Sequence, residues 1–148
     1  MAAADVEIEV IQSVDDELVA AWQRLLPQLS SSADPVTAQH LRTIVESAVT
    51  SLLVARVDGA VVGSLTLAVF PIPTGRRALI EDVVVDAAAR GRGVGEALTR
   101  AALERATALE ARTVDLSSRP SRAAANRLYQ RVGFERRETS VYRYSTLA

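Results

Sequence analysis

The feature that most constrains the fold is a β-branched, largely apolar run from Ala78 to Asp86, followed by a glycine-rich turn and a helical pattern. Apolar residues stand at consecutive positions of the run, which is typical of a strand buried on both faces at the centre of a sheet. The turn, from Arg90 to Gly95, comes next, and helix signals begin at about Gly93. The sequence therefore predicts a buried strand, a tight turn and a long helix in succession.

The rest of the chain alternates between strand and helix patterns. Alternating or β-branched residues predict strands at Val6 to Ile11, Ser51 to Arg56, Ala60 to Phe70, Ala78 to Asp86, Thr113 to Leu116, Phe134 to Arg136 and Ser140 to Tyr144. Helical spacing predicts one helix capped by Ser13 and ending near Pro27 to Leu29, one capped by Asp34 and running through Val49, one from about Gly93 through Leu109, and one from Ser121 to Arg131, closed by Gly133. Asp58-Gly59 predicts a two-residue hairpin turn.

This element order, βααβββαβαββ, predicts an α/β fold with a sheet of about seven strands and four helices. The chain has 148 residues, which is the usual size of one globular domain. The sequence contains no internal repeat and no linker long enough to separate domains. We therefore expect a single domain over residues 1–148.

Three features of the composition exclude whole classes of chemistry. The chain has no cysteine and no lysine, and His40 is its one histidine. These counts exclude a thiolate nucleophile, a lysine Schiff base, a Walker-type phosphate clamp and a multi-histidine metal site, so we expect no metal. His40 itself, on the second predicted helix, is expected at the surface or in the wall of the substrate site rather than in catalysis. The formal net charge of −1 disfavours nucleic-acid binding.

Two further absences concern membranes and secretion. No stretch reaches the roughly 18 apolar residues that a membrane span needs. The N-terminus also lacks the basic start and apolar core of a secretory signal. We therefore expect a cytoplasmic protein that does not bind membranes.

The turn from Arg90 to Gly95 is suited to hold an anion. Its glycines adopt positive φ readily and let a ligand approach the main-chain amides, while the helix N-terminus adds unpaired N–H groups and a partial positive charge. A dinucleotide-binding fold is disfavoured, because its glycine turn follows the first strand and has a different third spacing. From these residues alone, a glycine-rich turn without a ligand remains an alternative.

Two motifs occur together in this chain. The first is Arg90-x-x-Gly93-x-Gly95, after a strand that ends Glu81-Asp82-Val83-Val84-Val85-Asp86. The second is Ala125-Asn126-Arg127-Leu128-Tyr129-Gln130-Arg131-Val132-Gly133-Phe134-Glu135. Together they resemble the GNAT superfamily of acyl-CoA-dependent N-acetyltransferases, whose mixed central sheet is compatible with the element order predicted here. The resemblance covers about Ile80 to Glu135.

The resemblance implies an acetyl-CoA site built mainly from main-chain groups. In GNAT enzymes the glycine turn wraps the CoA pyrophosphate, which implies contacts from the consecutive residues Arg90, Gly91, Arg92, Gly93, Val94, Gly95 and Glu96. The pantetheine arm runs along the central strand like an added strand, here beside Val83, Val84 and Val85. Asn126 resembles the residue that holds the pantetheine or the diphosphate. Acetyl-CoA is therefore the implied acyl donor.

The resemblance also implies catalytic residues. Tyr129 matches the usual general acid, which donates a proton or a hydrogen bond to the departing CoA thiolate, and a phenol with a pKa of about 10 is protonated at neutral pH. Glu81 is the first candidate for the base that acts on the amine through water, because in a regular strand it shares a face with Val83 and Val85. Asp82, on the opposite face, is the alternative. Purely structural roles for Tyr129 and both acids remain open.

The predicted function is direct acetyl transfer from acetyl-CoA to a primary amine of a small molecule or a protein, without a covalent intermediate. One alternative is a non-catalytic acyl-CoA-binding sensor module on the same fold, and another is an interaction domain that binds no CoA. The acceptor is expected near Leu29 to Pro35, Phe70 to Thr74 and Arg136 to Tyr142, where few acids cluster, which disfavours a strongly polycationic acceptor. A terminal strand from Ser140 to Tyr144 would allow a homodimer.

Overall fold

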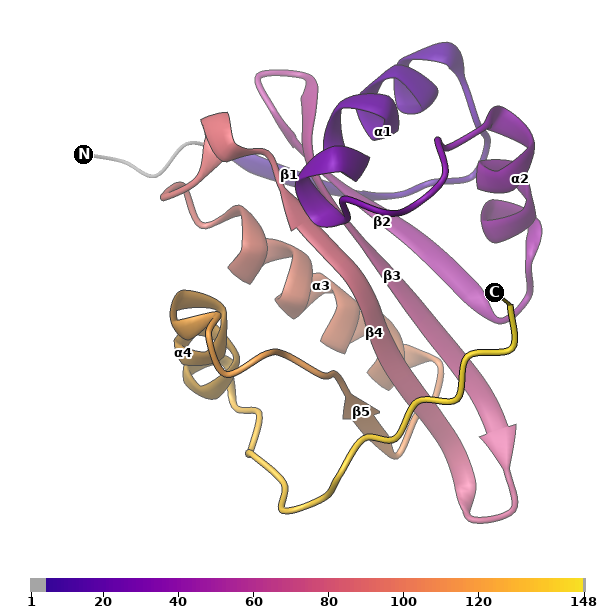
Figure 1. The fold of residues 1–148 in the computed structure, drawn as a ribbon, viewed down its shortest axis with the longest axis vertical. Helices are drawn as coiled ribbons and strands as arrows, with labels where there is room; N and C mark the ends of the chain where they lie inside the picture. Colours follow the sequence, from indigo (N-terminus) through magenta and orange to yellow (C-terminus); the bar gives the residue numbers. More distant parts are fainter. Residues whose placement is uncertain (1–4, 148) are drawn as a thin grey trace. The chain divides into compact units, whose positions relative to one another are not determined.

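A computed structural model describes residues 5–147 of the chain. Its helices and strands, in chain order, are β1 (Val6–Val10), α1 (Asp16–Leu29), α2 (Ala38–Glu46), β2 (Thr50–Val57), β3 (Ala60–Ile72), β4 (Gly75–Val85), the short 3-10 helix η1 (Ala87–Ala89), α3 (Val94–Ala108), β5 (Thr113–Asp115) and α4 (Ala123–Val132). The chain divides after Ser117 into two compact units, so that α4 belongs to the second unit and all the other elements to the first (Figure 1).

The first unit is built on a five-stranded sheet with the order β1-β2-β3-β4-β5. β1 to β4 pair antiparallel, and β5 pairs parallel to β4 after the crossover through α3. The predicted α/β class, mixed sheet and four helices are therefore confirmed. The central strand is β3 rather than the predicted β4, because β1 and β2 extend one side of the sheet and β5 alone follows β4. Asp58 and Gly59 form the predicted hairpin turn, with φ of 51° and 82°.

The two faces of the sheet are covered by different helices. α1 and α2 lie on one face and α3 lies on the other (Figure 1). Trp22 and Leu25 of α1 belong to the same core cluster as Val84 of β4, and each of the three is at most 5% exposed. On the α3 face, a Cβ at Gly63 would lie 2.9 Å from Val94, so β3 and α3 approach closely only because position 63 is glycine. Within residues 5–147, no helix is long and apolar enough to cross a bilayer.

The prediction of seven strands is wrong by two. Within the part of the chain that the structure describes, residues 134–147 form no strand, so the expected strands Phe134 to Arg136 and Ser140 to Tyr144 are absent. Val141 and Tyr144 are 81% and 90% exposed. Their β propensity does not suffice, because a strand is stabilised only by a neighbouring strand and by an apolar face to pack against. The edge on which we based the expected homodimer contact is therefore missing.

The first two helices begin at caps other than the predicted ones. Asp15, not Ser13, caps α1, and its carboxylate accepts a hydrogen bond from the Leu18 amide at 2.8 Å. Thr37, not Asp34, caps α2. Each stretch offers several Ser, Thr or Asp side chains within a few residues, and the cap is the one directly before the first helical residue. α2 ends at Glu46, so the predicted extension through Val49 is also wrong.

Candidate active site

A β-bulge lies in the middle of β4. Thr66 of β3 pairs with Glu81, whereas Ser64, two residues earlier, pairs with Val84, so β4 carries one residue more than β3 across this interval. Asp82 has a φ of 50°, in the left-handed region that Asp adopts more readily than β-branched residues do. The bulge therefore falls within the segment where we expected the catalytic base.

Because of the bulge, the prediction of the sheet face on which Glu81 lies is wrong. The extra residue reverses the alternation of side chains, so Glu81 shares a face with Val84 and not with Val83 and Val85. Val84 belongs to the core cluster under α1 and α2, and Glu81 therefore lies on that side of the sheet. Glu81 and Asp82 are both exposed, which also corrects the prediction of a strand buried on both faces.

The outer edge of β4 is open next to this bulge. β5 has three residues and pairs only with Arg77, Ala78 and Leu79 of β4. From Ile80 to Val85, no other strand of the described sheet pairs with β4 on the side away from β3. An extended ligand with amide groups adds to such an edge as a further strand does. Val83 to Val85 lie on this open edge, and the pantetheine contact expected of them stays a prediction.

The glycine turn joins β4 to α3 and leaves its main chain accessible. Gly91 and Gly93 have φ of 80° and 77°, and apart from each glycine and its two chain neighbours no heavy atom lies within 4 Å of the position that a Cβ would take. Gly93 is the N-cap of α3, and no side chain caps this end of the helix. The turn therefore presents a helix N-terminus and an open approach to the amides, as an anion requires.

The side chains of the turn lie on two sides of it. Arg90 and Arg92 are exposed, where a guanidinium can reach an anion beside the turn. Val94 is 2% exposed and packs inward, so only its main chain is available to a ligand. Gly95 lies in the first turn of α3, and its carbonyl accepts a hydrogen bond from Thr99 at 2.7 Å. The Glu96 carboxylate pairs with Arg100 at 3.2 Å.

Tyr129 is the buried residue of α4, in the second unit. Its side chain is 8% exposed, and its ring meets that of Phe134 edge to face with 5.9 Å between the ring centroids. Burial raises the pKa of the Tyr129 phenol above its ordinary value, and the positive charge of Arg122 opposes this rise. The phenol is therefore protonated at neutral pH and is available as a donor.

Asn126 shares a side of α4 with Tyr129, three residues later. Its amide nitrogen donates to the carbonyl of Arg119 at 3.0 Å, which ties the helix to the loop that precedes it. One donor of Asn126 thus has a structural role within the second unit. The structure brings the β4 and turn residues together within the first unit, and Asn126 with Tyr129 within the second.

Two residues in contact with the turn region carry no recognisable signal in the sequence. Arg24 of α1 forms an ion pair with Asp86 at 3.0 Å, and Gln28 of α1 accepts a hydrogen bond from the Ala87 amide at 2.8 Å. Polar residues four positions apart on a helix usually mark its solvent face, so this pattern gave no reason to choose them. Within residues 5–147, no group of three or more acidic or histidine side chains has the arrangement of a metal site.

A comparison with known protein families matches residues 11–134 to the acetyltransferase (GNAT) family. Glucosamine 6-phosphate N-acetyltransferase 1 of Oryza sativa subsp. japonica is 48% identical over 69 residues, which are 47% of this chain and 39% of that protein. The chain is thus matched to less than half the length of this curated relative.

Solved structures with the same fold cover nearly the whole chain. A Trypanosoma brucei acetyltransferase is 27% identical, with a TM-score of 0.77 over 95% of this chain and 100% of that chain. The aminoglycoside N-acetyltransferase AAC(6')-Iy, solved in complex with CoA, is 18% identical, with a TM-score of 0.78 over 97% of each chain. At that identity the second similarity shows the fold alone.

Proposed function

Because this chain belongs to the acetyltransferase (GNAT) family, we propose that it transfers the acetyl group of acetyl-CoA directly to a primary amine. The family that the two motifs predicted is confirmed by the family match over residues 11–134. The donor, the acceptor and the residue roles are the proposal. The observation that carries it is the glycine turn, whose accessible main chain begins α3 and follows, through η1, an unpaired strand edge.

The features of the first unit suit the two parts of CoA. We assign the pyrophosphate to the main-chain amides of Arg90 to Glu96, since an anion is stabilised by a helix N-terminus and by exposed guanidinium groups. We assign the pantetheine arm to the open edge at Val83 to Val85, since its amides can pair with a strand backbone. Asn126 is proposed to hold the pantetheine or the diphosphate, following the family motif.

The proposed reaction needs a base, an acid and a polarised carbonyl. The neutral amine nitrogen forms a bond to the acetyl carbon, the C–S bond breaks, and the electron pair leaves with sulfur. Glu81 takes a proton through water from the ammonium form of the acceptor, which its exposure permits, and so supplies the neutral amine. Tyr129 donates a proton to the thiolate, and the proton that the nitrogen loses as the amide forms passes to solvent. A main-chain N–H at Val83 or Val84 stabilises the oxyanion. No residue of the chain needs to carry the acetyl group.

We propose an amino sugar of low positive charge as the first acceptor class to test. Two of the similar proteins are named as acetyltransferases of glucosamine 6-phosphate and of aminoglycosides, and both acceptors carry an amine on a sugar. β4 carries the two exposed acids Glu81 and Asp82, but also the exposed Arg76 and Arg77. This balance favours an acceptor with one amine, or with an amine and a phosphate, over a polycation.

Calorimetric titration with acetyl-CoA, followed by a thiol-release assay with a panel of amines, tests this proposal. We expect saturable binding near one equivalent per chain and release of CoA thiol with at least one amino sugar. Binding without thiol release from any amine would favour the sensor module. Absence of binding would overturn acetyl-CoA as the donor.

A further inference from the structure

Two side chains of α1 hold the segment that leads from β4 into the glycine turn. Nε of Arg24 donates to Oδ2 of Asp86 at 3.0 Å, and Oε1 of Gln28 accepts from the Ala87 amide at 2.8 Å. Arg24 and Gln28 are four residues apart, on one side of the helix, and their partners are consecutive. α1 therefore bonds to Asp86 and Ala87, the two residues that directly follow β4.

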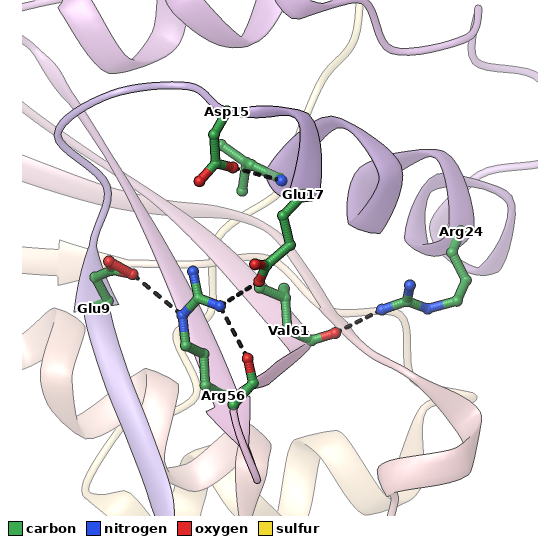
Figure 2. A network of polar contacts seen from close by, with 8 residues as sticks. Glu9, Asp15, Glu17, Arg24, Arg56 and Val61 are labelled. Carbon is green, nitrogen blue, oxygen red and sulfur yellow. Dashed lines mark hydrogen bonds and ion pairs between the residues drawn. The ribbon is translucent and has the colours of Figure 1, made fainter.

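Asp86 is fixed from three directions. Its own amide donates to the Val62 carbonyl of β3 at 2.8 Å, and its second carboxylate oxygen accepts from the Ala88 amide at 3.1 Å, which caps η1. The third contact is Arg24, which is itself anchored by donating to the Val61 carbonyl at 2.6 Å, the bond drawn in Figure 2. Asp86 thus links α1 to η1, because its carboxylate bonds to Arg24 of α1 and to the Ala88 amide of η1.

η1 leads directly into the turn. Ala89 is 4% exposed and anchors η1 in the core, and Arg90 follows as its C-cap. Beyond it, the Cβ positions at Gly91 and Gly93 face open space, so packing against these positions does not hold the turn. Its conformation is therefore determined by its two ends, η1 on one side and α3 on the other.

A second arginine docks α1 at its other end. Arg56 of β2 bonds to Glu17 of α1 and to Glu9 of β1, and also donates to the Gly59 carbonyl (Figure 2). This cluster ties α1 to the sheet without touching the turn. Because Arg56 already attaches α1 to the sheet, we infer that the Arg24 and Gln28 contacts do more than hold the helix in place.

We propose that Arg24 and Gln28 are positioning residues for the acetyl-CoA turn, which they preset through Asp86 and Ala87. The inference rests on the proposed function, because it assigns these residues a part in acetyl-CoA binding. If the turn already has its bound conformation in the ligand-free protein, less conformational entropy is lost when acetyl-CoA binds, and the Kd is lower. Neither side chain needs to contact acetyl-CoA or the acceptor for this effect.

The test compares Arg24→Met with the matched control Arg56→Met. Both substitutions remove one arginine that bridges α1 to the sheet, but only the first removes a contact next to the turn. We expect Arg24→Met to raise the Kd and the KM for acetyl-CoA about fivefold while kcat at saturation stays unchanged. Arg56→Met lowers the Tm and leaves the Kd within about twofold. Gln28→Ala, at an exposed helix position, repeats the test if Arg24→Met folds poorly.

Hydrogen exchange of the ligand-free protein separates this inference from the proposed function. We expect faster amide exchange over residues 86–93 in Arg24→Met and in Gln28→Ala, but not in Arg56→Met. Unchanged exchange and an unchanged Kd would overturn the inference, as would equal weakening by Arg24→Met and Arg56→Met. If the wild-type protein binds no acetyl-CoA, the proposed function and the binding role of Arg24 and Gln28 are both overturned, even where the two variants show faster exchange.

Discussion

The glycine turn in the first unit and α4 in the second unit offer two opposite kinds of site. At Gly91 and Gly93 the useful groups are main-chain amides, and nothing occupies the space where a Cβ would be. At Tyr129 the useful group is one phenol at the end of a side chain that is 8% exposed. A main-chain site is sensitive to any side chain that changes φ or fills the approach, whereas a side-chain site is sensitive to one functional group. Substitutions in the two regions should therefore affect different constants.

The largest effect is expected at Gly93. In Gly93→Asp, a side chain must adopt a φ of 77°, and its carboxylate points into the space proposed for the pyrophosphate. Backbone strain of about 1–2 kcal/mol and charge repulsion together should weaken acetyl-CoA binding about 100-fold or more, as measured by calorimetry.

Gly59 is a matched control for this substitution. It has a φ of 82°, no atom lies within 4 Å of its Cβ position, and it lies in the β2–β3 hairpin. Gly59→Asp should lower the Tm by a similar amount and leave the Kd for acetyl-CoA unchanged. Equal Kd values for Gly93→Asp and the wild type would remove the turn from the donor site.

The second effect, at Tyr129, should appear in kcat. Tyr129→Phe removes the phenolic donor and keeps the ring that meets Phe134 edge to face. We expect kcat to fall about 100-fold with the Kd for acetyl-CoA unchanged. Because burial raises the pKa of the Tyr129 phenol, loss of its proton should occur at higher pH than in a free tyrosine, and this group should not limit the wild-type rate at neutral pH. A Tyr129→Phe enzyme with wild-type kcat would leave the phenol a packing role only.

Local chemistry explains which features were predictable from the sequence. The hairpin at Asp58-Gly59 and the turn at Gly91 and Gly93 were predicted because positive φ at a glycine is a property of the residue itself. Four helices and the order of the first five strands followed from hydrophobic periodicity in the same way. Such features need no knowledge of a distant partner.

The bulge, the Arg24 contact and the absence of the terminal strands were missed because each depends on a distant partner. The bulge at Asp82 arises from the register between β3 and β4, which an alternating pattern in one strand does not contain. The Arg24 contact with Asp86 spans 62 residues. The strand predicted at Ser140 to Tyr144 failed for the same reason, since β propensity specifies no neighbour. The bulge is the most consequential miss, because it moved Glu81 to the other face.

A smaller effect should show whether Glu81 or Asp82 is the base. At neutral pH, Glu81→Gln is expected to lower kcat about tenfold, and Asp82→Asn is expected to leave it within about twofold. The loss in Glu81→Gln should shrink as the pH rises, because an amine that is already neutral needs no base. The pH profiles of kcat for the two variants decide the assignment, and the reverse order of effects would make Asp82 the base.

The smallest effect concerns the stability that Asp86 contributes at the start of the turn. The hydrogen bond from the Ala88 amide lowers the pKa of the Asp86 carboxyl, and the bond from Arg24 lowers it further. A carboxyl whose pKa is lower in the folded state stabilises the protein above its unfolded-state pKa of about 3.9, and this contribution is lost as the pH falls through the lower folded value. Asp86→Asn should therefore reduce the free energy of unfolding by less than about 1 kcal/mol at pH 7, because the Arg24 side chain is 49% exposed and solvent screens the pair.

Urea unfolding across the acid range should show this difference between Asp86→Asn and the wild type diminishing toward low pH. A difference that stays constant with pH would mean that Asp86 acts through the geometry of the η1 cap and not through its charge.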